Sequence, residues 1–102
     1  MKTKKNLTRK EILALLQKNQ SMLNKCKVKK IGLFGSYALG KQRKKSDLDF
    51  LVVFKELKFD NYIELKFLLE KIFHKKVDLV IEEDLKPALK YVKEEALYAK
   101  GL

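Results

Sequence analysis

The sequence predicts a single α/β domain (an α+β arrangement) in which a small mixed sheet of three or more strands is flanked by helices. A length of 102 residues suits one domain, and apolar residues make up 46% of the chain, enough for one core. Short runs of β-forming residues also alternate with stretches of helical periodicity. With one proline and four glycines there is no room for a linker, so residues 1–102 are expected to form one domain.

The first helix is expected to run from residue 8 to about residue 24. Thr8 suits the N-cap position, and Glu11 stands at the reciprocal position of a capping box. Apolar residues then recur at helical spacing along one stripe, namely Ile12, Leu15, Leu16 and Leu23.

Three strands are expected from short runs rich in β-branched and aromatic residues. The runs are Val28 to Phe34, Leu48 to Phe54, and Val77 to Ile81. Between the first two, Gly35-Ser36 breaks the first strand, a short helix begins near Tyr37, and residues 41–46 form a polar loop.

Two further helices complete a predicted order in which helices and strands alternate. One runs from Asp60, as its cap, to about His74, with an inward apolar face made of Leu65, Leu68, Leu69, Ile72 and Phe73. The other begins near Pro87, a residue that suits the first turn of a helix. The tail after residue 95 fits either a helix or a strand.

The charge is unevenly distributed along the chain. Residues 1–45 hold 14 Lys and Arg with one acid, whereas residues 46–102 hold 10 Lys and Arg with 12 acids, for a net charge of +11. The basic half fits either a face for polyanions or a merely Lys-rich composition. Direct nucleic-acid binding is not expected, because only two of the 24 basic residues are Arg, the residue that pairs bidentately with phosphate and guanine.

The sequence also bears on the compartment. It has no run of about 18 apolar residues, so no membrane span is expected. The basic N-terminus is not followed by the apolar stretch of a secretory signal. Cys26 is the single cysteine, which rules out an intrachain disulfide, and we therefore expect a cytoplasmic protein.

Three carboxylates stand at the heads of two predicted strands. Asp47 and Asp49 point to the same face, about 7 Å apart along the chain, because side chains alternate across a strand. Asp78 opens the third strand in a similar way. If these strands are neighbours, all three acids converge, and such a cluster of hard oxygen ligands suits Mg²⁺ or Mn²⁺ with positions left for phosphates.

The end of the first strand adds a second element to this site. Gly35 lets the backbone approach a ligand closely, and the Ser36 hydroxyl can donate to phosphate oxygens. Each feature alone is more often structural, since Ser-Asp before a strand is commonly a turn. Their conjunction at one end of successive strands instead favours a metal–triphosphate site.

The spacing of these residues resembles a known family. Gly35-Ser36, ten further residues and Asp47-Leu48-Asp49 resemble the motif of the DNA polymerase β-like nucleotidyltransferase superfamily. Residues 8–99, including SDLDFLVVF and KVDLVIEEDLKPALKYVKEEALYAK, look like the minimal nucleotidyltransferases (MNT).

The resemblance implies an antitoxin of a HEPN/MNT toxin–antitoxin pair, which transfers AMP from ATP to a tyrosine of a HEPN RNase toxin. By this carry-over Asp47, Asp49 and Asp78 are the catalytic and metal-binding residues, Asp47 and Asp49 contacting both of two Mg²⁺ ions. Gly35 and Ser36 would hold the β- and γ-phosphates of ATP. The partners implied are ATP and a HEPN-family toxin.

One residue departs from the pattern, because many relatives read G-S-x-A-R-G and this chain has Leu39 where that Arg would be. Lys41 or Arg43 would then supply a cation to the nucleotide, or the motif Arg is a packing device that this chain lacks. The alternative function is therefore a non-catalytic antitoxin that neutralises its toxin by direct binding. A third reading, nucleotide transfer to an RNA end, is less favoured because the chain has no separate domain to position nucleic acid.

Overall fold

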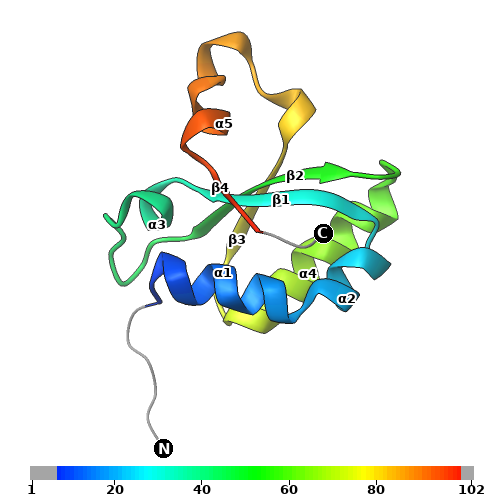
Figure 1. Cartoon of the computed structure of the whole chain (residues 1–102), viewed down its shortest axis with the longest axis horizontal. Coiled ribbons are helices and arrows are strands. Elements are labelled where there is room, and N and C mark those ends of the chain that lie inside the picture. Colours follow the sequence, from blue (N-terminus) through cyan, green and yellow to red (C-terminus); the bar gives the residue numbers. More distant parts are fainter. Residues whose placement is uncertain (1–6, 100–102) are drawn as a thin grey trace, which may run out of the picture.

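The computed structural model describes residues 7–99, which form one sheet with helices on it (Figure 1). The helices are α1 (Arg9–Lys18), α2 (Gln20–Lys25), α3 (Ser36–Leu39), α4 (Phe59–Phe73) and α5 (Tyr91–Glu95). The strands are β1 (Val28–Phe34), β2 (Leu48–Phe54), β3 (Val77–Ile81) and β4 (Leu97–Tyr98). Two single 3₁₀ turns, η1 (Glu82–Asp84) and η2 (Pro87–Leu89), lie between β3 and α5.

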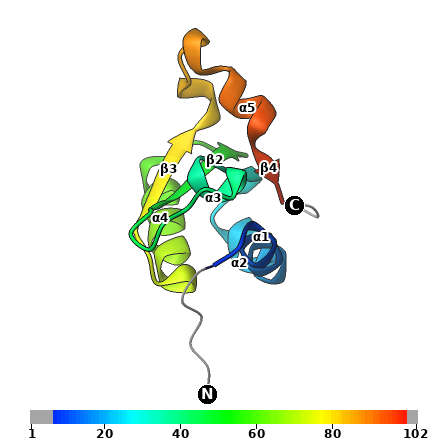
Figure 2. The ribbon, with the colours of Figure 1, turned by 90° about the vertical axis from the view of Figure 1, so that its left-hand side faces the viewer.

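The four strands form a mixed sheet in the order β3-β2-β1-β4. Strand β1 pairs antiparallel with both β2 and β4, whereas β2 and β3 are parallel. The helices α1, α2 and α4 cover one face, and the segment from η1 to α5 rises from the other (Figure 2). The predicted fold class, a small mixed sheet of at least three strands flanked by helices, is confirmed.

The core lies between the sheet and the helices. Alternate residues of β2 point into it, because successive side chains of a strand face opposite sides. These inward residues are Leu48, Phe50, Val52 and Phe54. They pack with Ile12 and Leu16 of α1 and with Leu65 and Leu69 of α4, all fully buried. This alternation leaves Asp49 and Leu51 on the face away from these helices.

The first helix differs from the prediction, because it is interrupted at Asn19. The predicted capping box at Thr8 and Glu11 is present. At Asn19, however, the side-chain amide donates to the Leu15 carbonyl at 2.8 Å, and the backbone turns before α2 begins. Asparagine favours such local side-chain bonds over a continuous helix, so the expected single helix is two.

Helix α4 begins two residues earlier than predicted, because Asp60 is not its cap. The N-cap position is held by Lys58, which makes no side-chain capping bond, and Asp60 lies in the first turn. There a carboxylate still favours the positive end of the helix dipole. Helix α4 also bonds to the start of β3, because the Glu70 carboxylate accepts a hydrogen bond from the Val77 amide at 3.1 Å.

The last part of the chain is less helical than predicted. Pro87 begins the 3₁₀ turn η2, and the helix proper starts only at Tyr91. The tail, for which helix and strand were both open, forms β4 on the edge of β1, and its residues after 99 lie outside the described range. No helix within residues 7–99 is long and apolar enough to cross a membrane.

Candidate active site

The parallel pairing of β2 and β3 brings the predicted acids together. Asp49 and Asp78 are direct partners in register, one strand spacing apart, about 4.8 Å in such sheets. Asp47 lies two residues before Asp49, immediately ahead of β2, and the Leu48 amide donates to the Lys76 carbonyl at 3.1 Å. The three carboxylates therefore meet at the end of the sheet where β2 and β3 begin.

The charge of these acids is uncompensated within the described part of the chain. Burial, and after it the negative charges of Asp78 and Asp47, together raise the pKa of the half-buried Asp49 to about 6. No basic side chain among residues 7–99 forms an ion pair with any of the three. Asp47 and Asp78 are exposed, so the cluster opens to solvent beside a half-buried carboxylate.

Gly35 lies directly against the central acid. Strand β1 ends at Phe34, which pairs with Asp49, and the chain turns at Gly35 with φ of 77°. A Cβ atom at this position would overlap Oδ2 of Asp49 and lie 3.0 Å from its Cγ. Only glycine combines this positive φ with so close an approach, so the Gly-Ser turn is brought onto the acid cluster.

Ser36 follows as the first residue of α3, and the buried side of this helix packs against the core. Tyr37 and Ala38 are buried, at 1% and 5% exposure, and join the main core. Gly40, with φ of 72°, ends the helix, and the Lys41 amide donates to the Ser36 carbonyl at 2.9 Å. The predicted pair Gly35 and Ser36 therefore stands on a fixed turn beside Asp49.

Basic residues line the same end of the sheet. The loop at residues 41–46 carries three lysines and an arginine, all exposed. Lys75, two residues ahead of β3, donates from Nζ to the Lys44 carbonyl at 3.3 Å and lies 5.9 Å from the centre of the Tyr37 ring. Lys75 was not among the predicted site residues, although its place three residues before Asp78 was an available signal.

The acids suit a hard divalent cation in kind, since all the donors are carboxylate oxygens. As they stand, no three His, Cys, Asp or Glu side chains within residues 7–99 form a group that encloses an ion. The mutual repulsion evident at Asp49 is the condition that a cation would relieve.

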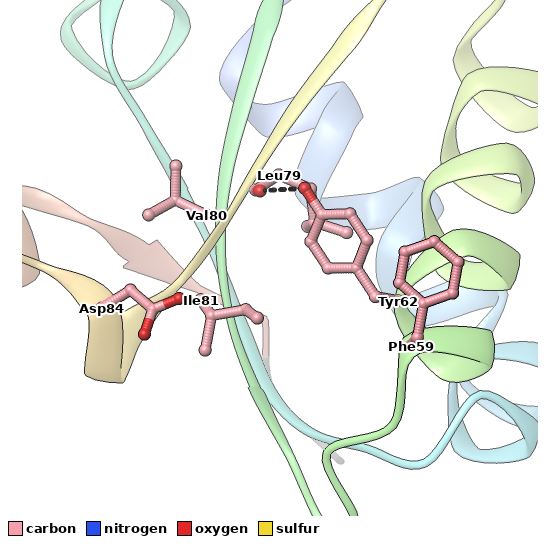
Figure 3. A pocket seen from close by; sticks show the side chains of 6 residues that line it. All are labelled: Phe59, Tyr62, Leu79, Val80, Ile81 and Asp84. Carbon is pink, nitrogen blue, oxygen red and sulfur yellow. Dashed lines mark hydrogen bonds between the residues drawn. The ribbon is translucent and has the colours of Figure 1, made fainter.

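A separate hollow of about 430 Å³ lies beyond the acids, between the start of α4 and the far half of β3 (Figure 3). It is lined by Phe59, Tyr62, Leu79, Val80, Ile81 and Asp84. Tyr62 crosses to β3 and donates to the Leu79 carbonyl at 2.7 Å. None of the five predicted site residues lines this hollow, so the candidate site is the open acid cluster.

Comparison with known proteins identifies the family. The family described as nucleotidyltransferase domain matches residues 10–100. The chain belongs to this nucleotidyltransferase family. It is 38% identical over 95 residues to the protein adenylyltransferase MntA of Thermococcus cleftensis, and the match covers 90% of this chain and 96% of the relative.

Solved structures agree with the nucleotidyltransferase fold. A protein described as a minimal nucleotidyltransferase is 31% identical, with a TM-score of 0.78 over 92% of this chain and 98% of that one. A toxin–antitoxin structure with AMP-PNP is 32% identical, with a TM-score of 0.56 over 81% and 64% of the two chains. A chain in the complex of a tri-AMPylated Shewanella oneidensis HEPN toxin with MNT antitoxin is 26% identical to this one. Its TM-score is 0.51, and the match covers 76% of this chain and 61% of that chain.

Proposed function

We propose that this nucleotidyltransferase is an antitoxin that transfers AMP from ATP to a tyrosine hydroxyl of a cognate HEPN toxin in the cytoplasm. The observation that carries the proposal is the meeting of Asp47, Asp49 and Asp78 at one end of the sheet, beneath the Gly35 turn. The similar MntA and MNT proteins support the choice of an adenylyl group and of a HEPN partner.

Each site residue has a role in this proposal. Asp47 and Asp49 would hold both of two Mg²⁺ ions, and Asp78 would complete the position nearest the acceptor hydroxyl. Gly35 and Ser36 would bind the β- and γ-phosphates through the backbone and the Ser36 hydroxyl. When bound, the ions would supply Lewis-acid neutralisation of the charge on the phosphates.

The transfer itself needs positioning more than covalent chemistry from the protein. The tyrosine oxygen forms a bond to the α-phosphorus, the α–β phosphoanhydride bond breaks, and pyrophosphate leaves with the bonding electrons. The tyrosine proton is released to solvent. Because the pKa of Asp49 is about 6, this carboxylate is mostly ionised at neutral pH, as the proposal requires.

A labelling experiment tests this function. The purified protein is incubated with Mg²⁺, the product of the neighbouring gene as the candidate HEPN toxin, and ATP labelled at either the α- or the γ-phosphate. The proposal requires label on the toxin from α-labelled ATP and none from γ-labelled ATP. Label from the γ-position would indicate a kinase, and label from neither would contradict catalysis.

Leu39 favours the second candidate, an antitoxin that acts by binding alone. Its side chain is 49% exposed, so the motif position that many relatives fill with Arg carries no charge here. A binding antitoxin would still protect cells after Asp47→Asn or Asp49→Asn and would copurify with its toxin. The catalytic proposal requires both substitutions to abolish protection while the purified variants remain folded.

A further inference from the structure

Helix α1 contacts the helix that follows the Gly-Ser turn through a charged hydrogen bond. Nη1 of Arg9 donates to the Ala38 carbonyl at 2.8 Å, across 29 residues of sequence. Ala38 is in α3, two residues beyond Ser36. Nη1 of Arg9 also lies 4.0 Å from the position that a Cβ atom on Gly40 would occupy. Arg9 therefore sits at the C-terminal end of α3.

A second bond joins the same two parts of the chain. Nε2 of Gln42 donates to the Leu7 carbonyl at 3.0 Å, immediately before α1. Its Oε1 is buried and has no hydrogen-bond partner among the described residues. The start of α1 is thus bonded to both the end of α3 and the loop that follows it.

These bonds matter because α3 has only four residues. A helix of one turn is not stable by itself, so contacts with the rest of the protein set its position. Tyr37 and Ala38 anchor its buried side, and Arg9 places a cation where the helix dipole favours one. A shift of α3 would move Ser36 relative to Asp49.

We propose that Arg9 is a positioning residue for nucleotide binding, which fixes Gly35 and Ser36 over the acid cluster through the Ala38 carbonyl. This inference rests on the phosphate-binding role proposed for Gly35 and Ser36. Arg9 of α1 thereby supplies a cation at the C-terminal end of α3. The position in α3 where the motif has an Arg is occupied here by the half-exposed Leu39.

The test compares Arg9→Gln with Lys10→Gln, which removes a positive charge from an exposed neighbour on the same helix. The affinity for AMP-PNP is measured with Mg²⁺ at physiological salt, together with the thermal midpoint without nucleotide. Arg9→Gln should weaken AMP-PNP binding about fivefold, on the order of the contribution of one hydrogen bond. Arg9→Lys should recover part of this loss, and Lys10→Gln should bind like the wild type.

Ser36→Ala separates failure of this inference from failure of the proposed function. If Ser36→Ala weakens binding and Arg9→Gln does not, Arg9 has no positioning role although the Gly-Ser assignment stands. If Ser36→Ala also leaves the affinity unchanged, the phosphate-binding assignment is wrong and the Arg9 inference with it. An equal loss in Lys10→Gln, or a lower thermal midpoint with unchanged affinity in both Arg9 variants, would likewise overturn it.

Discussion

The carboxylate of Asp49 lies against the backbone of Gly35, so the end of β1 passes directly over the central acid of the cluster. The contact links the two halves of the motif, which are separated by the α3 turn and its following loop. Because the two groups are in contact, a shift of the Gly35 turn toward β2 would displace the Asp49 carboxylate.

Replacing Gly35 tests this contact. Gly35→Ala places a Cβ on Oδ2 of Asp49 and strains a backbone with φ of 77°, so we expect AMP transfer to be lost. Gly40→Ala is the control for a positive φ alone, because its backbone is left-handed helical (φ 72°, ψ 21°), where alanine costs about 1–2 kcal/mol, and a Cβ there makes no clash. The backbone of Gly35 (φ 77°, ψ −154°) lies in a region essentially confined to glycine, so Gly35→Ala adds both a larger backbone strain and the clash with Asp49. Activity is measured at a temperature where both variants are folded. Equal activity in the two variants would contradict the account.

The stability of the protein should depend on pH through Asp49. Its pKa is about 6 in the folded state against an ordinary value of 3.8, so the folded state binds the proton more tightly. The contribution of this group to the unfolding free energy therefore falls as the pH rises from about 4 to about 6. Above about pH 6 the folded state bears the full cost of the ionised carboxylate. The shift corresponds to about 3 kcal/mol, which solvent screening of a half-exposed group reduces to roughly 1–2 kcal/mol.

Asp49→Asn removes that cost. In urea denaturation the variant should exceed the wild type by roughly 1–2 kcal/mol in unfolding free energy at about pH 8 and match it near pH 4. Glu95→Gln, at an exposed position outside the site, should show no such difference. A gain of the same size at both pH values would show that the gain does not come from removing the ionised Asp49 carboxylate.

Binding of Mg²⁺ should compete with protonation of the same acid. We expect Mg²⁺ to raise the thermal midpoint at about pH 8 and to have little effect near pH 5, below the pKa of about 6 at Asp49. The measurement is a thermal melt with and without Mg²⁺, with NaCl at equal ionic strength as the control. A midpoint that rises equally at the two pH values, or in Asp49→Asn, would place the ion elsewhere.

The contacts of Glu82 should stabilise the segment from η1 to β4, on the face of the sheet opposite α1, α2 and α4. This carboxylate, 10% exposed, accepts from the Tyr98 hydroxyl at 2.8 Å and pairs with Lys30 at 3.8 Å and Lys93 at 3.4 Å. Tyr98→Phe should lower the unfolding free energy by about 1 kcal/mol through loss of the hydrogen bond. Tyr91→Phe, at a side chain 53% exposed, should be neutral. Equal effects of the two substitutions in urea denaturation would contradict a role for the Glu82 contacts.

Much of the local structure could be predicted, since β-branched and aromatic runs mark β1, β2 and β3 at the bounds that the structure has. The break at Asn19 could not, because it depends on whether one side chain bonds to its own backbone or to solvent. Strand β4 was also left open, since two residues carry too little periodicity to distinguish a strand from a helix.

The candidate site was predictable as a set of residues but not as an arrangement. Motif spacing selected Gly35, Ser36, Asp47, Asp49 and Asp78, and their roles in catalysis stay predictions. The sheet order that makes Asp49 and Asp78 neighbours is a long-range property that spacing does not contain. Arg9 carries no sequence signal at all, because its contact with Ala38 depends on how α1 crosses α3.

We expect Asp49 to be required for the transfer of AMP to a HEPN toxin, and intact-mass spectrometry of the toxin measures this transfer. The product of the neighbouring gene, the candidate toxin, is coexpressed with the wild-type chain or with Asp49→Asn, and its intact mass is then measured. With the wild type we expect a toxin heavier by one or more AMP groups, and with Asp49→Asn an unmodified toxin. A harmless but unmodified toxin beside the wild-type chain would contradict it.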